Sequence, residues 1–215
     1  EDLKGKQILI AKHKTCSRFL DEYIKKCPNS SLKKLFQSFT GHFEELSTDI
    51  YASYNVENIT KEALQRLEEG DNESAFNELL ASFLTELTQV SGNLADDPSG
   101  SRVIRCIFNS LSKQSSLVTR IDKLARKIIQ SFRDNPSKIR STYFSATLQS
   151  MLSLDKERFG KLLNYLISSV SFKFEDLSDK CTSKLIEVLI TNMGKSAITA
   201  IYEQTLTNNE NLPSN

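Results

Sequence analysis

Five segments of this 215-residue chain carry a serine followed by polar side chains at the same two spacings. With each serine as offset 0, offset +1 is aromatic or cationic in four of the five segments, and offset +4 is charged or an amide in all five. A hydroxyl donates and accepts hydrogen bonds, a carboxylate only accepts, and an arginine only donates. We therefore expect a polar binding surface along these segments. The residues are Ser17, Arg18 and Asp21; Ser53, Tyr54 and Glu57; Ser101, Arg102 and Arg105; Ser145, Ala146 and Gln149; and Ser183, Lys184 and Glu187.

The residues between these polar positions predict a helix with two different sides. At about 100° per residue, offsets 0, +1 and +4 lie on one side and offsets +2, +3, +6 and +7 on the other. We expect the second side to be buried and the serine side to be exposed. The second segment keeps the pattern least well, because Asn55 and Thr60 occupy apolar offsets, and the fourth has Thr147 at +2. The apolar residues of the other segments are Phe19, Leu20, Tyr23 and Ile24; Val103, Ile104, Ile107 and Phe108; and Leu185, Ile186, Leu189 and Ile190.

The spacing of the serines predicts an internal repeat. Successive serines are separated by 36, 48, 44 and 38 residues, and a period near 36 residues with insertions is typical of stacked helical repeats. Asp49, Asp97 and Asp179 stand four residues before three of the serines, where a carboxylate can cap a helix and stabilise it by about 1 kcal/mol. Each repeat is thus predicted to be a helix, a short turn and a capped helix. The preceding helices are expected within residues 32–46, 76–94 and 159–170.

Charge is separated into blocks along the chain although the formal net charge is only +1. Residues 1–42 carry +5, residues 43–100 carry −11, residues 101–161 carry +9 and the remainder carries −2. A basic surface is therefore compatible with the near-neutral total. The acidic residues near 60–74 fall in a long interval between serines, and we expect this stretch to be an inserted, mobile helix and loop that is the least ordered part of the chain.

Composition excludes several classes of protein. No apolar run is long enough to span a membrane, and the sequence has no secretory signal. It begins at Glu1 instead of methionine, so we expect a piece of a longer protein. The cysteines form no CxxC pair and no zinc spacing with a histidine, which predicts reduced, structural thiols in an intracellular protein. They are Cys16, Cys27, Cys106 and Cys181.

The sequence also argues against an enzyme. It has no glycine-rich phosphate loop, no nucleophile elbow and no carboxylate pair outside the repeat pattern. His13 and His42 are interpreted as surface or packing residues. We expect no catalytic residue, no metal site and no cofactor.

The triads at offsets 0, +1 and +4 on a repeat of about 36 residues resemble Pumilio repeats, in which one helix per repeat presents three side chains to one RNA base. LFQSFTGHFEELSTDIYAS, LASFLTELTQVSGNLADDPSGSRVIRCIF and FEDLSDKCTSKLIEVLI resemble the divergent repeats of the nucleolar-protein-nine family. The resemblance covers nearly the whole chain but about the first half of such a protein. It implies an all-α, right-handed α-solenoid of about five repeats in a single domain, 1–215. The expected repeats are 1–31, 32–75, 76–116, 117–157 and 158–215.

The same resemblance implies a function. Members of that family are nucleolar factors of small-subunit ribosome assembly that bind pre-ribosomal RNA and restrain premature cleavage by a PIN-domain endonuclease. For this chain it implies single-stranded or looped pre-rRNA as a partner, with other pre-ribosome assembly factors as further partners. It implies localisation in the nucleolus, no enzyme activity and no membrane partner.

Carried over by position, the resemblance assigns roles to the triads. The edge-reading pairs become Ser17/Asp21, Ser53/Glu57, Ser101/Arg105, Ser145/Gln149 and Ser183/Glu187, and the stacking residues become Arg18, Tyr54, Arg102 and Lys184. In this family a Ser/Glu pair favours guanine, Ser/Gln adenine and Ser/Arg cytosine, which gives 5′-G-A-C-G-3′ for units five to two. Two features of the fourth unit depart from the pattern: Ala146 cannot stack, and Phe144 is bulky where small residues precede the other serines. Cations between Lys123 and Arg140 are expected to contact phosphates.

An alternative remains open. The repeated polar positions can be the exposed face of a helical-repeat scaffold that binds proteins and no RNA. Preference for single-stranded RNA, with an affinity that falls as salt rises, distinguishes the two interpretations.

Overall fold

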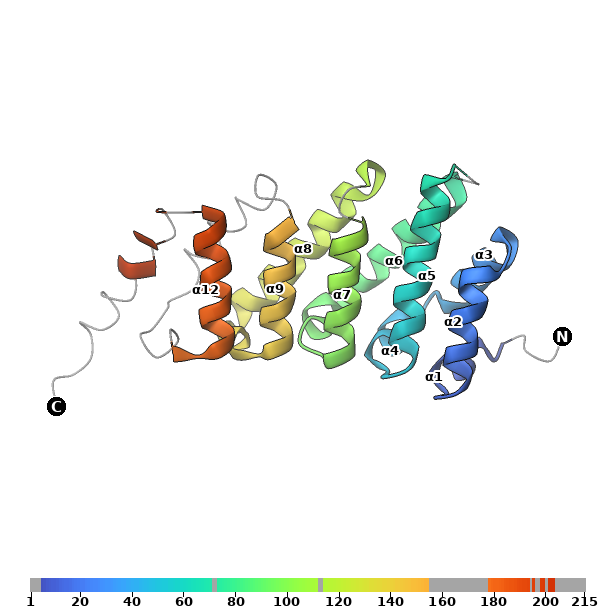
Figure 1. The fold of residues 1–215 in the computed structure, drawn as a ribbon, viewed down its shortest axis with the longest axis horizontal. Coiled ribbons are helices and arrows are strands. Elements are labelled where there is room, and N and C mark those ends of the chain that lie inside the picture. The colour runs from blue at the N-terminus through green and yellow to red at the C-terminus, as the bar shows by residue number, and fades with distance from the viewer. Residues whose placement is uncertain are drawn as a thin grey trace. The chain divides into compact units, whose positions relative to one another are not determined.

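The computed structural model is helical throughout the part of the chain that it describes, and no strand occurs there (Figure 1). This confirms the predicted all-α class. The described residues are 5–70, 73–111, 114–154, 178–193, 195, 198–199 and 201–203.

All five serine-bearing segments are helical, and they form α2, α5, α7, α9 and α12. The predicted helix at 159–170 lies outside the described residues. The elements are α1 (Gln7–Lys12), α2 (Cys16–Lys26), α3 (Asn29–Phe39), α4 (Phe43–Thr48), α5 (Ala52–Glu68), α6 (Glu73–Leu94), α7 (Pro98–Leu111), α8 (Val118–Asp134), α9 (Thr142–Leu154) and α12 (Lys180–Met193), with 3-10 turns η1 (Ser115–Leu117) and η2 (Pro136–Arg140).

The helices form two compact units, Glu1–Lys127 and Ile128–Asn215. In the first unit α2, α5 and α7 lie side by side, and α3 and α6 form a second layer behind them (Figure 1). In the second unit α9 packs against α12 and η2. Helices that carry consecutive serines are therefore direct neighbours within each unit. A single five-repeat solenoid remains a prediction.

An aromatic cluster joins α3, α4 and α6 of the first unit. Phe36, Phe43 and Phe83 come from α3, α4 and α6, and all three are almost completely buried. Their ring centroids lie 4.6–5.9 Å apart in edge-to-face geometry. Such pairs stabilise a fold by about 0.5–1.5 kcal/mol beyond the burial of their area. The cluster fixes the second layer, against which α5 and α7 pack.

The three predicted helix caps form. Asp49 Oδ1 accepts hydrogen bonds from the backbone N–H groups of Tyr51 and Ala52 at 2.8 and 2.9 Å. Asp97 Oδ1 accepts from Ser99 and Gly100 at 2.9 and 2.7 Å. Asp179 Oδ2 accepts from the N–H and the hydroxyl of Thr182, both at 2.8 Å. Each carboxylate satisfies N–H groups that have no partner within the helix.

The other two repeats use different side chains at the same offset, −4, which the sequence analysis did not anticipate. His13 Nδ1 lies 3.3 Å from the backbone nitrogens of Thr15 and Cys16, and Ser141 Oγ accepts from the N–H of Phe144 at 3.4 Å. The acceptor at offset −4 is therefore a property of all five repeats. His13 has a structural role as the acceptor of the first.

The predicted apolar side is buried in the third unit and only partly in the first. Val103, Ile104, Ile107 and Phe108 are all buried in α7. In α2, however, Phe19 is 73% exposed and Tyr23 is 48% exposed. The expectation of burial is wrong for these two residues. In the part of the chain that the structure describes, Phe19 and Tyr23 line an open groove between α1 and α3, which leaves both side chains accessible to solvent.

The expected mobile insertion at 60–74 is corrected over residues 60–68, which are the second half of α5. Thr60, Ala63, Leu64 and Leu67 are buried there. Arg66 is buried as well and binds both Glu62, at 2.8–2.9 Å, and Asn29 Oδ1, at 2.9 Å. The acidic residues of this stretch thus belong to a packed amphipathic helix. Residues 71 and 72 lie outside the described part.

The described residues include no helix long and apolar enough to cross a membrane. They include no group of three or more His, Cys, Asp or Glu side chains that could hold a metal ion. All four cysteines are free thiols, and burial raises the pKa of Cys27 and Cys106 above the ordinary value. Raised pKa values keep these two thiols protonated and unreactive, as expected for structural cysteines.

Gly100 is predicted to be essential for packing. A Cβ atom at this position would lie 2.7 Å from the carbonyl oxygen of Leu94, which is a backbone atom and cannot rotate away. We expect Gly100→Ala to lower the free energy of unfolding by about 1–3 kcal/mol, because the helix must shift. Urea unfolding measures the loss, and Ser99→Ala in the same turn is the control. Equal stability of the two variants would contradict this prediction.

Asp179 predicts an acid-dependent loss of stability. Hydrogen bonds from the N–H and hydroxyl of Thr182 lower the pKa of Asp179 below its ordinary value of 3.8. A pKa lowered by folding means that the cap stabilises the fold above the unfolded-state pKa and stops doing so as the pH falls through the folded-state pKa. Unfolding curves between pH 7 and pH 3 should show Asp179→Asn losing less stability than wild type below about pH 4. Identical pH dependence would contradict this role.

Candidate nucleic-acid interface

The serine hydroxyls do not point outward as predicted in four of the five repeats. Ser17, Ser53, Ser101 and Ser145 are at most 5% exposed, and Ser183 on α12 is exposed. The serines lie where neighbouring serine helices meet: Ser145 Oγ donates to the carbonyl of Cys181 on α12 at 2.9 Å. A serine is small enough to let two helices approach closely. The expectation of an exposed hydroxyl is therefore wrong for these four residues.

Three of the serine hydroxyls bond to the backbone at the start of their own helix or in the turn just before it. Ser17, Ser101 and Ser183 donate to the carbonyl three residues earlier, at 3.3, 3.3 and 3.1 Å. Such bonds are typical of serine near a helix start. A hydroxyl bonded in this way keeps acceptor capacity but has used its proton.

The side chains at offset +1 form the exposed part of the row. In the first unit Arg18 and Tyr54 are exposed, and Arg102 is partly exposed, on three neighbouring helices. Lys184 is exposed on α12 of the second unit. The expectation that offset +1 can meet a ligand is compatible with this placement, and the RNA-binding roles of the triads stay predictions.

The contact between α5 and α7, in the first unit, contains the most connected group of predicted site residues. Arg102 on α7 reaches across to α5, where its Nη2 donates to Ser53 Oγ at 2.7 Å and its Nε donates to Glu57 Oε1. The Arg102 Cζ atom lies 3.6 Å from the centroid of the Tyr54 ring. Lys61 lies 3.8 Å from the other oxygen of Glu57. All three members of the second triad thus contact the stacking residue of the third.

This Arg102 group was not foreseen from the sequence, although a signal for it exists. Neighbouring serine helices lie side by side within each unit, with their serines on the same side. The side chain at offset +1 of one helix can therefore contact the side chains at offsets 0, +1 and +4 of the preceding helix. A long donor at +1 following a Ser-Tyr-x-x-Glu repeat is therefore the pattern to look for. The Glu57 side chain is only 12% exposed and that of Arg102 is 30% exposed, so solvent screens this pair less than a surface pair.

Asn55 on α5 links the second repeat to the first in a similar way. Asn55 Nδ2 donates to Asp21 Oδ1 and to the carbonyl of Ser17, the latter at 2.9 Å. By its residue type, Asn55 fits the apolar pattern of the repeat poorly. It is completely buried as expected for offset +2, and its amide joins α5 to α2.

The remaining triads are engaged within their own repeats or with the next helix. Arg105 Nε donates to the carbonyl of Ser101 at 3.3 Å, and Gln149 Nε2 donates to Ser145 Oγ at 3.1 Å. Lys184 and Glu187 form an exposed ion pair at 2.7 Å. These contacts leave capacity for further hydrogen bonds in each unit.

Phe144 does not obstruct the surface of the fourth unit. Its ring is completely buried and stacks on Phe132, with centroids 6.1 Å apart. The bulk of Phe144 is therefore absorbed by the core of the second unit. Ala146 is partly exposed and, having no flat group, leaves the fourth unit without a stacking side chain.

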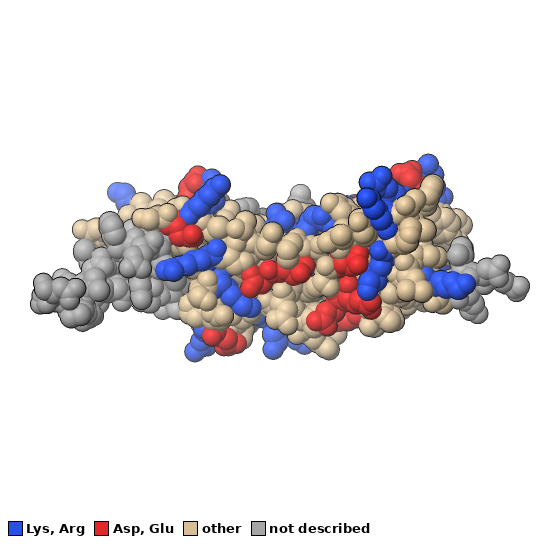
Figure 2. Space-filling model, turned by 90° about the horizontal axis from the view of Figure 1, so that it is seen from below, with Lys and Arg blue, Asp and Glu red and all other residues tan. Residues whose placement is uncertain are grey.

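The charge blocks of the sequence neutralise one another across helices. Lys12 pairs with Glu45, which lowers the pKa of Glu45, and Arg102 pairs with Glu57. Each pair joins a basic block to the acidic block between them. Figure 2 shows cations and carboxylates side by side on the face that it draws, with neither sign covering it.

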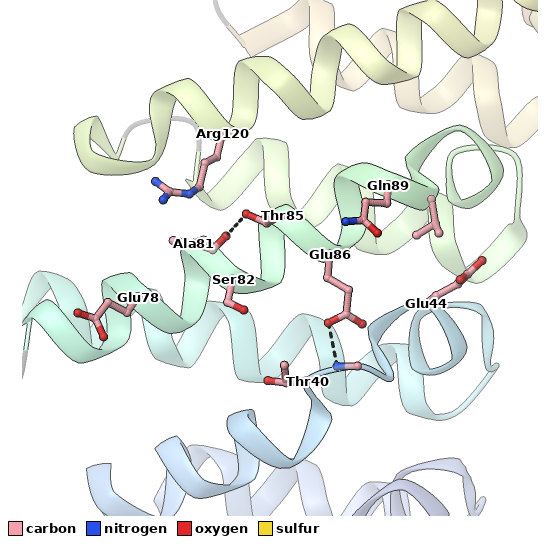
Figure 3. Close-up of a pocket in the computed structure, with 11 residues that line it drawn as sticks. Thr40, Glu44, Glu78, Ala81, Ser82, Thr85, Glu86, Gln89 and Arg120 are labelled. Carbon is pink, nitrogen blue, oxygen red and sulfur yellow. Dashed lines mark hydrogen bonds between the residues drawn. The ribbon is translucent and has the colours of Figure 1, made fainter.

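The lysines expected to contact phosphates belong partly to another surface. Lys123 and Lys127 line a groove of about 560 Å³ together with Thr85 and Gln89 of α6, away from the serine helices. Its neighbour, of about 680 Å³, is drawn in Figure 3, where Arg120 extends from α8 toward α6.

Figure 3 also shows the carboxylates of this second groove. Glu86 on α6 points to the turn before α4, where its carboxylate accepts from the N–H groups of Gly41 and Phe43 at 2.9 and 2.8 Å. Glu44 and Glu78 line the same groove. The second layer of the first unit thus carries a groove of mixed charge.

Comparison with known proteins agrees with this geometry. The NOP9-like PUF repeat domain matches residues 5–120. Nucleolar protein 9 of Komagataella phaffii is 27% identical over 196 residues, which are 77% of this chain and 30% of that protein. Nucleolar protein 9 of Kluyveromyces lactis is 25% identical over 226 residues, which are 94% of this chain and 33% of that protein. The chain spans about a third of the length of these curated relatives.

Solved structures show the same fold. A structure of APUM23 with GGAUUUGACGG superposes with a TM-score of 0.77 at 17% identity and covers 96% of this chain and 46% of that chain. The RNA-binding domain of yeast Puf5p bound to MFA2 RNA gives 0.67 at 12% identity, covering 92% of this chain and 50% of that chain. These similarities confirm the Pumilio-like helical fold. The family match also confirms that the chain is not an enzyme. The chain belongs to the NOP9-like PUF repeat family.

Proposed function

We propose that this chain binds single-stranded or looped RNA along its serine helices, as one solenoid of five repeats over residues 1–215. The observation that carries the proposal is the row of Arg18, Tyr54 and Arg102 on three neighbouring helices of the first unit. Flat aromatic and guanidinium groups stack on bases for about 1–3 kcal/mol each. The family match and the likeness to structures of RNA-bound proteins support this function.

The RNA is pre-ribosomal and belongs to the small-subunit pathway. The relatives named nucleolar protein 9 support a nucleolar protein of ribosome biogenesis. In this proposal the bound solenoid covers pre-rRNA, restrains its premature cleavage and meets other assembly factors there. Because the chain spans about a third of those relatives, further repeats of the whole protein would share the RNA.

Base preference follows the side chains at offset +4. Glu57 and Glu187 only accept hydrogen bonds, and guanine offers two adjacent donors on its Watson–Crick edge. Gln149 suits adenine and Arg105 suits cytosine, which gives 5′-G-A-C-G-3′ for units five to two. With four serines buried, the residue at +4 carries more of the discrimination than its serine partner.

Protein binding without RNA is the second candidate. The groove between α6 and α8 favours it, because Arg120, Lys123 and Glu78 present both charge signs to one polar channel. Such a channel suits a peptide of mixed charge.

The class of nucleic acid tests the proposal. Fluorescence anisotropy should show binding to single-stranded RNA in preference to single-stranded DNA and duplex RNA. Between 50 and 200 mM salt the affinity should fall by about tenfold or more, because phosphate contacts release counterions. Absence of RNA binding at low salt would reject RNA binding in favour of the protein-scaffold function.

Glu187→Gln tests base reading in the fifth unit. The described ion pair of Glu187 lies within one exposed turn of its own helix, so the substitution disturbs no neighbouring repeat. We expect loss of about 1–3 kcal/mol of guanine preference at one base, with affinity for RNAs that carry another base there unchanged. RNAs that differ only at that base provide the measurement. If wild type shows no guanine preference, recognition proceeds through shape and stacking instead.

A further inference from the structure

We propose that Arg102 occupies, in the RNA-free chain, the place that a guanine would take in the second unit, and that RNA must displace it. The inference rests on the proposed RNA-binding function and assigns Arg102 a role in closing the base-binding position of the second repeat. It reverses the assignment of Arg102 as a simple stacking residue.

The guanidinium reproduces the contacts expected of guanine. Its Nε and Nη2 groups donate to Glu57 Oε1 and to Ser53 Oγ, whereas guanine would offer its two adjacent donors to the same acceptors. The flat guanidinium also covers the Tyr54 ring, with Cζ 3.6 Å from the centroid, as a base would. Arg102 therefore occupies both the hydrogen-bond acceptors, Glu57 and Ser53, and the face of the Tyr54 ring.

The space between Arg102 and Tyr54 is too small for a base. Stacked groups make contact at about 3.5–4.0 Å, so a base between the two would require a separation of about 7 Å. The observed 3.6 Å is the contact distance of the two groups themselves. A base can stack on Tyr54 only after the guanidinium has moved.

Displacement favours guanine over the other bases. When Arg102 leaves, the largely buried Glu57 loses a charged partner, and an unsatisfied buried carboxylate is unfavourable. Guanine replaces the lost donors with two of its own, whereas adenine, cytosine and uracil each present one donor beside an acceptor. Arg102 therefore raises the threshold for every base and leaves guanine with the smallest penalty. The apparent affinity is reduced by the fraction of chains in which the site is closed.

Arg18 provides a matched comparison. It occupies offset +1 in the first unit and is exposed, and among the described residues no hydrogen bond or ion pair is formed by its side chain. Arg18 is therefore able to stack without first breaking a contact. The two arginines have the same type, offset and helix position but opposite expected effects on RNA binding.

The experiment compares wild type, Arg102→Ala, Arg102→Lys and Arg18→Ala by fluorescence anisotropy, with single-stranded RNAs that carry each of the four bases opposite the second unit. Arg102→Ala should bind the guanine RNA about tenfold more tightly than wild type, corresponding to release of one charge-assisted contact. The gain for the other three bases should be of similar size, because a closed site reduces the apparent affinity for every base that must displace Arg102 by the same factor. Arg102→Lys keeps the charge, but its ammonium group cannot donate two hydrogen bonds in a plane while stacking on Tyr54, so its affinity for RNA should increase less. Arg18→Ala should bind RNA more weakly than wild type. Thermal unfolding checks that each variant is folded.

The outcomes separate this inference from the proposed function. If wild type binds RNA and folded Arg102→Ala binds it equally or more weakly, Arg102 is a stacking residue or a structural link, and displacement is refuted. If neither wild type nor Arg102→Ala binds any of the RNAs, the proposed function itself fails, and displacement fails with it. RNA binding that appears or strengthens only in the Arg102 variants supports both.

Discussion

Neighbouring serine helices approach closely at the serine, and this packing sets where the other side chains of each repeat lie. Ser53 and Ser101 are completely buried, whereas Gly100, the residue before Ser101, lies against the backbone of Leu94 at the end of α6. A larger residue at the serine position would separate the helices. The serine is thus first a packing residue, and its burial brings the polar side chains at offsets +1 and +4 of adjacent repeats within reach of each other.

That proximity makes the surface a set of contacts between repeats. Arg102 joins α7 to α5, Asn55 joins α5 to α2, and Ser145 joins α9 to α12. A side chain that joins two serine helices in this way is already hydrogen-bonded, so a ligand that binds it must compete with that contact. The same contacts therefore affect both the stability of the fold and the binding of a ligand. A buried donor or acceptor that loses its partner within the protein must form a hydrogen bond with the ligand instead.

The ion pairs follow the same logic. The acidic block of the sequence lies between two basic blocks, and Lys12–Glu45 and Arg102–Glu57 link it to each. Folding converts a segregated charge pattern along the chain into a mixed surface. The net charge of a sequence segment therefore overstates the positive potential that a nucleic acid would encounter at the surface. Individual cations without an ion pair among the described residues, such as Arg18, contribute more to the attraction of phosphates.

The sequence by itself determined the features that depend on residues close in the chain: the helical class, the repeat, the aspartate caps and the buried side of α7. Helix periodicity and capping involve neighbours within about four residues, so their signal is local. The capping contacts of His13 and Ser141 are equally local. They were not predicted because only aspartate was considered as an acceptor at offset −4, and histidine and serine accept there as well.

Only the tertiary structure decided which side chains of the two sides are buried. Ser53 is buried because α7 covers it, and Phe19 is exposed because it lines an open groove between α1 and α3. The partner of Arg102 likewise depends on which helix lies beside α7 and at what distance. Residues 45 and 49 positions apart meet in that one contact, and no periodicity within a single helix carries that information.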